Sequence, residues 1–193
     1  MGPNIIKSLI YRKNNLSTQT CFGYLPKRQG VSTIMVTNNR FTVERTNTLI
    51  SDVTVGVSYA ALDAGDFGFY GKKGQTYSFD ARVVYSAVAA TDGAAFSITA
   101  PATPTSIHFI SEYNTDSTTV VRTACVAIDT PDHGSASVIS TTGFNTAHVY
   151  GVITPSADGF IAVSCIAENA STIVAKANLS TLTWKRVDFP SEP

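Results

Sequence analysis

The sequence is poor in charge, in cysteine and in long apolar runs, and each shortage excludes a class of protein. Lysine, arginine, aspartate and glutamate make up 15% of the 193 residues, against about 25% in ordinary soluble domains. A polar surface with so few charges suits a chain that sits against other chains, although secreted sandwiches share it. No stretch approaches the roughly 18 apolar residues of a membrane-spanning helix, so we expect no membrane partner.

Three cysteines, Cys21, Cys125 and Cys165, are too few and too odd in number for a disulfide framework. Cys125 and Cys165 each lie in a strand-like run, so we interpret both as small buried apolar residues. A bridge between them is the alternative if their strands are neighbours. Residues 5–11 are too short a run for a signal-peptide core, and Ile6 stands where myristoylation requires serine or threonine. We therefore expect a soluble chain that the usual export route does not take.

The first 30 residues differ in charge from the rest of the chain. They hold five basic and no acidic residues, whereas the remainder holds nine basic and fourteen acidic residues. A basic arm on an acidic body is typical of an arm that binds an acidic surface; a solvated, mobile terminus is the plainer alternative. Prolines and glycines interrupt any regular period in the arm, so we expect it to be extended. The five basic residues are Lys7, Arg12, Lys13, Lys27 and Arg28.

The strongest strand signal lies in residues 62–85. Two strand-like runs flank a turn at residues 71–74, and the second run alternates over residues 77–85, with tyrosine, phenylalanine, alanine and valine on one face. Such period-two alternation is typical of a half-buried β-strand. The opposite face carries Asp80 and Arg82, which we expect to pair with neighbouring strands.

Short strand-like runs separated by turn residues fill the rest of the chain, without a convincing helical period. This pattern predicts an all-β sandwich or barrel, with residues 1–45 as the arm and first strands and residues 46–193 as the sandwich. Residues 118–128 are apolar on both faces, which is typical of a central strand or of one packed against another subunit. The other runs cover residues 31–36, 41–45, 49–57, 96–100, 107–111, 138–141, 147–153, 160–167, 173–177 and 181–186.

The residue types that carry chemistry form no recognised pattern. His108, His133 and His148 lie on different runs with no second ligand at metal spacing, so we predict no metal site and no cofactor. Residues 132–135 place an aspartate, a histidine and a serine together, whereas real catalytic triads converge from distant positions. Glycosidase carboxylates can lie anywhere in a sequence, so hydrolysis of a polysaccharide stays open as an alternative.

A nucleic-acid partner would bind through the arm. Tyr11, Phe22 and Tyr24 lie among its cations, and aromatic rings with basic residues stack on single strands. The body is acidic, however, and five charges spread over 30 residues are thin. We therefore do not expect a nucleic-acid partner.

Residues 64–85, above all 74–85 (GQTYSFDARVVY), and the closing residues 182–187 (LTWKRV) carry a resemblance to a known family. They resemble the small TNF-like or C1q-like β-sandwich domains of tailed-phage structural proteins, and the hairpin at residues 154–167 fits as well. The resemblance covers residues 46–187. It implies an antiparallel, jelly-roll type of sandwich that assembles as a homotrimer.

Residues 1–45 fall outside this resemblance and contain no long repetitive shaft of the kind that phage fibres carry. A stand-alone trimeric sandwich with a basic arm is similar to capsid decoration, or cement, proteins. The resemblance therefore implies a non-enzymatic virion protein on the capsid surface, with the major capsid protein as its partner and the five basic arm residues as contacts. The alternatives are a receptor- or glycan-binding head of a fibre, using loops such as 86–95 and 129–137, and a hydrolase of surface polysaccharide.

Overall fold

The computed structural model describes residues 19–20, 32–37, 40–62, 67–116, 118–130, 140–169 and 172–187. Within these residues the chain forms fourteen β-strands and no helix. All strand pairs are antiparallel, and the strands form one ten-stranded and one four-stranded sheet. The predicted all-β class with antiparallel, sandwich-like sheets is therefore confirmed.

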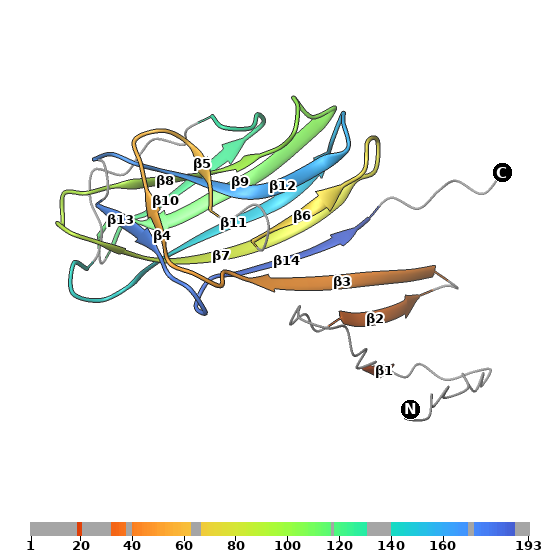
Figure 1. Ribbon diagram of the computed structural model, residues 1–193, viewed down its shortest axis with the longest axis horizontal. Helices are drawn as coiled ribbons and strands as arrows, with labels where there is room; N and C mark the ends of the chain where they lie inside the picture. The colour runs from red at the N-terminus through yellow and green to blue at the C-terminus, as the bar shows by residue number, and fades with distance from the viewer. Residues whose placement is uncertain are drawn as a thin grey trace, which may run out of the picture.

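The larger sheet has the order β1-β2-β3-β14-β7-β11-β9-β10, and β13 joins it by pairing with both β7 and β4 (Figure 1). Its strands are β1 (Gln19–Thr20), β2 (Ser32–Thr37), β3 (Arg40–Thr48), β4 (Val53–Val55), β7 (Tyr77–Ala87), β9 (Ser106–Asn114), β10 (Val120–Cys125), β11 (Asn145–Thr154), β13 (Ile173–Ala175) and β14 (Thr181–Arg186).

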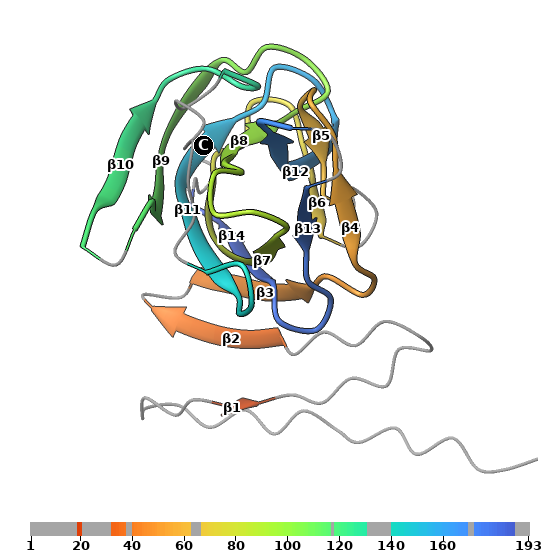
Figure 2. The same ribbon diagram turned by 90° about the vertical axis from the view of Figure 1, so that its left-hand side faces the viewer.

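In the smaller sheet, β12 lies at the centre, between β8 on one edge and both β5 and β6 on the other. Viewed roughly along the strands, the larger sheet curves around the smaller one, and the core fills the space between them (Figure 2). The strands of the smaller sheet are β5 (Ala60–Ala61), β6 (Gly68–Gly71), β8 (Ala94–Thr99) and β12 (Gly159–Ala167).

Strand β7 organises the larger sheet, as its alternation predicts. It pairs with β11 along one edge, and with β14 and then β13 along the other. Its odd-numbered residues from Tyr77 to Ala87 are buried, while Asp80 and Arg82 are exposed on the outward face. The turn predicted before it is present, and Gly74 adopts φ 73° there, a conformation that glycine reaches without steric strain.

Aromatic rings join the two sheets across the core. Phe96 on β8 lies 5.3 Å from the ring centroid of Tyr85 on β7 and 6.0 Å from that of Tyr113 on β9. All three side chains are at most 1% exposed. Aromatic pairs at this spacing contribute about 0.5–1.5 kcal/mol beyond the area that they bury. The packing of β8 against the larger sheet therefore holds the sandwich closed.

Gly151 on β11 lies where three strands approach most closely. It is in register with Phe79 of β7 and Phe109 of β9, whose rings lie 6.5 Å apart. A Cβ atom at Gly151 would overlap the carbonyl oxygen of His108 and lie 2.5 Å from the Cα of Phe109. Only glycine fits here, because the obstructing atoms belong to a neighbouring backbone.

The structure corrects three sequence predictions. Residues 118–128 do not form a central strand: β10 ends the sheet order, and Val120 and Val126 are 52% and 75% exposed. Of residues 49–57, only Val53–Val55 form a strand, because the backbone N–H of Leu49 donates to Ser180 in the β13–β14 connection. Ser140, from the strand predicted at 138–141, instead accepts and donates hydrogen bonds to the side chain of Asn145.

The alternative of a Cys125–Cys165 bridge is also wrong. Cys125 lies on β10 of the larger sheet and Cys165 on β12 of the smaller one, and both are buried free thiols. Burial raises the pKa of the Cys165 thiol above its usual value. Both residues behave as the small apolar core residues that the sequence predicts.

The β2–β3 hairpin extends past the body of the sandwich. Only Arg45–Thr48 of β3 pair with β14, whereas the preceding residues of β3 pair with β2 alone. The hairpin therefore projects beyond the end of β14, along the lower edge in Figure 1. Buried core residues of the described chain begin at Leu49, so the projecting part of the hairpin adds nothing to the core.

Candidate functional site

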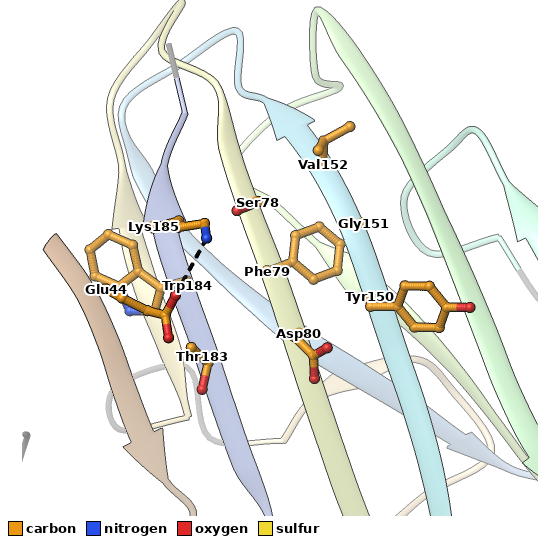
Figure 3. A pocket seen from close by; sticks show the side chains of 10 residues that line it. All are labelled: Glu44, Ser78, Phe79, Asp80, Tyr150, Gly151, Val152, Thr183, Trp184 and Lys185. Carbon is orange, nitrogen blue, oxygen red and sulfur yellow. Dashed lines mark hydrogen bonds and ion pairs between the residues drawn. The ribbon is translucent and has the colours of Figure 1, made fainter. Parts of the chain in front are cut away.

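A shallow groove of about 530 Å³ crosses the outward face of four adjacent strands, β3, β14, β7 and β11 (Figure 3). Outward side chains alternate with core side chains along each of these strands. The rings of Phe79 and Trp184 belong to the core: Phe79 is 4% exposed, and Trp184 stacks on Phe69 of the smaller sheet at 4.8 Å. The groove is lined by Glu44, Ser78, Phe79, Asp80, Tyr150, Gly151, Val152, Thr183, Trp184 and Lys185.

Short side chains form the middle of the groove and longer ones its sides. Ser78 and Thr183 carry the central hydroxyl groups, and Thr183 hydrogen-bonds Thr46 on β3 at 3.0 Å between their Oγ1 atoms. Tyr150 and the 42% exposed Val152 rise from β11 on one side. The groove thus combines hydroxyl groups with one aromatic and one aliphatic side chain.

Each carboxylate of the groove has a cationic or ionisable neighbour. Glu44 Oε2 lies 3.4 Å from Lys185 Nζ, and Asp80 Oδ1 lies 3.0 Å from His148 Nε2. Surface ion pairs of this kind contribute little to stability. They do balance the charge of the groove, so a neutral ligand can bind without separating an ion pair.

The Asp80–His148 contact continues as a polar network over the neighbouring strands. The His148 and Tyr150 rings lie 4.4 Å apart. Arg122 on β10 donates to the Tyr150 hydroxyl at 2.8 Å and lies 3.5 Å from Glu112 on β9. The network therefore spans β7, β11, β9 and β10 and fixes the orientation of the tyrosine at the groove.

The chemistry available here is hydrogen bonding and ring stacking. Among the described residues, no group of three histidine, cysteine, aspartate or glutamate side chains could hold a metal ion. The hydroxyls, amine and carboxylates of the groove match the hydrogen-bonding needs of a hydroxyl-rich molecule, and Tyr150 offers a partly exposed ring. The groove is suited to binding.

The sequence-predicted site residues lie elsewhere. Lys7, Arg12, Lys13, Lys27 and Arg28 all fall outside the described residues. So do His133 and the segment 132–135. Of the loops expected to carry a receptor site, residues 88–93 connect β7 to β8, whereas only Asp129 and Thr130 of 129–137 are described.

Sequence reasoning missed the groove because its residues come from four distant segments. The alternation of β7 correctly predicts that Asp80 points outward and pairs with a neighbouring strand, as its contact with His148 shows. It does not indicate which strand that is. Asp80 and His148 are 68 residues apart, and only the register of β7 with β11 brings them together.

None of the described residues forms a helix that is long and apolar enough to cross a membrane. Comparison with protein-family models, with curated proteins and with solved structures finds no match to this chain.

Proposed function

We propose that the chain is a non-enzymatic structural protein of a tailed-phage particle, which decorates and stabilises the capsid as a homotrimer. Residues 46–193 form the body, of the jelly-roll or TNF-like type. The basic residues Lys7, Arg12, Lys13, Lys27 and Arg28 contact the major capsid protein at the virion surface.

The observation that carries this proposal is the β2–β3 hairpin. It leaves the core at Arg45 and continues the sheet past the end of β14, so the chain before it is built away from the sandwich. That preceding chain has five basic and no acidic residues, while the remainder has an excess of five acidic residues. An extended basic segment held outside an acidic body is suited to lie along a larger acidic partner.

Binding of this kind stabilises a shell by mass action. A protein that binds the assembled shell and not its free subunits lowers the free energy of the assembled state. Many copies, each contributing a modest contact, oppose the pressure of packaged DNA without any covalent bond. The proposal thus needs a folded body and an accessible arm, and no catalytic group.

Deletion of residues 1–30 tests the proposal. The truncated protein should remain a folded trimer in light scattering and lose co-sedimentation with decoration-free capsids of the parent phage. A full-length variant with the five arm cations changed to glutamine is the matched control for charge, and it should also lose binding. Retention of capsid binding by the truncated protein would contradict the arm model.

A second function, a receptor- or glycan-binding head, is favoured by the groove. Its balanced ion pairs, its central hydroxyls of Ser78 and Thr183 and its partly exposed Tyr150 fit a neutral saccharide. Under this alternative, Tyr150→Ala should abolish saturable binding of the isolated protein to host cells, and Val152→Ala should weaken it less. Equal binding by the wild type and Tyr150→Ala would remove the groove from consideration.

A further inference from the structure

The two ends of the sandwich carry opposite charge. One end, here the acidic end, consists of the connections β7–β8, β9–β10 and β12–β13. The carboxylates there are Asp92, Asp116 and Glu168, and these connections contain no lysine or arginine. Their common position follows from the register, because β7, β9 and β12 all end there.

The opposite end consists of the connections β6–β7, β8–β9 and β11–β12, at residues 72–76, 100–105 and 155–158. We name it the basic end, since it carries Lys72 and Lys73 against the single carboxylate Asp158. These three connections lie together at the upper right of Figure 1, and the β2–β3 hairpin projects in the same direction below them. The basic end therefore faces the same way as the element that leads to the arm.

An exposed aromatic pair lies beside the basic end. Tyr70 on β6 and Phe160 on β12 are in register, 46% and 45% exposed, with ring centroids 5.6 Å apart at 88°. The next residues towards the basic end are Gly71 and Gly159, so no side chain at those two positions shields the rings from a partner. Lys72 Nζ lies 5.0 Å from the Tyr70 ring, which places a cation at the edge of the apolar surface.

Hydrogen bonds hold this surface in one conformation. Asp158 accepts from Lys72 Nζ and from the backbone N–H of Lys73, both at 2.8 Å, and the N–H of Gly74 donates to Pro155 at 2.9 Å. The ion pair lowers the pKa of Asp158 and raises that of Lys72. Because the turns are tied to each other, the rings are presented without loss of loop entropy on binding.

Exposed aromatic side chains with a cationic rim are characteristic of residues that dominate protein–protein affinity. We propose that the basic end, with Tyr70 and Phe160 as its anchors, is the surface by which the sandwich body docks on an acidic protein surface of the capsid, leaving the acidic end outward. This inference rests on the proposed function and adds the orientation of the body. Like charge directs the acidic end away from the same surface, so the charge distribution orients the approach.

Co-sedimentation of full-length protein with decoration-free capsids tests the orientation. Tyr70→Ala/Phe160→Ala should weaken binding by roughly tenfold or more, as truncation of interface anchors does. The matched control is Phe144→Ala/Leu179→Ala, which removes two side chains of 58% and 47% exposure away from the basic end and should bind as the wild type does.

Lys73→Glu supplies a test that leaves the turns intact, because Lys73 contacts Asp158 through its backbone. It should weaken binding at low salt, with the difference fading towards roughly 1 M salt as screening increases, whereas Glu168→Lys at the acidic end should not weaken it. If the wild type binds and both basic-end variants bind equally well, the orientation is wrong and the arm model stands. If the wild type itself does not bind capsids, the proposed function fails.

Discussion

Gly151→Ala should destabilise the sandwich far more than its single added methyl group suggests. The new Cβ would lie 2.5 Å from the Cα of Phe109, against about 3.4 Å for ordinary van der Waals contact, so β9 has to retreat by about 0.9 Å. That movement strains the β11–β9 ladder, in which Gly151 is paired with Phe109 and Val152 with His108.

The expected loss is about 2–3 kcal/mol of unfolding free energy, the upper part of the range for overpacked cores, because the atoms that must move are backbone. For a chain of this size, 1 kcal/mol corresponds to about 2–4 °C in Tm. Thermal unfolding followed by circular dichroism should therefore show Gly151→Ala melting about 4–12 °C below the wild type.

Gly56→Ala is the matched control. A Cβ at Gly56 meets nothing within 4 Å, and the residue is exposed, so this variant should stay within about 0.5 kcal/mol of the wild type. A Gly151→Ala variant that unfolds at the wild-type temperature would refute the close approach of β11 and β9, and with it the register that builds the groove.

Three further outcomes test other parts of the structure. Phe109→Ala should cost about 3–5 kcal/mol in urea unfolding, because Phe109 is 0% exposed; Phe144→Ala, at an exposed ring, should be nearly neutral. Backbone and hydroxyl donors of the β9–β10 turn lower the pKa of Asp116 from 3.8 to about 2, so the stabilisation is complete above 3.8 and is lost as the pH falls towards 2. Asp116→Asn should therefore be less stable than the wild type at neutral pH, with the gap closing in acid. In a Cys21→Ser background, the buried Cys125 and Cys165 should react with a thiol reagent only after unfolding, and labelling of the native protein would contradict their burial.

The turns and strands that local chemistry specifies were predictable. Alternation along β7 identifies both the strand and its buried face, and the glycine-rich turn before it places Gly74 where a positive φ is needed. Short-range patterns of this kind depend only on side-chain polarity and on the backbone freedom of single residues.

Pairing between strands was not predictable from the same patterns. The run containing β10 is apolar on both faces in sequence, which fits a centre or an edge equally; the sheet order puts it at the edge. Cys125 and Cys165 look alike in sequence and belong to different sheets. Apolar alternation specifies which face of a strand is buried and carries no information on its neighbour.

The sequence by itself determined the all-β class, the inward face of β7 and the charge contrast between the first 30 residues and the remainder. Only the tertiary structure decided that Asp80 meets His148, that Glu44 meets Lys185 across the groove, and that Lys72 and Lys73 lie at the opposite end from Asp116 and Glu168. The physical reason is that a strand's period is local, whereas its partner is selected by hydrogen bonding and core packing over the whole chain.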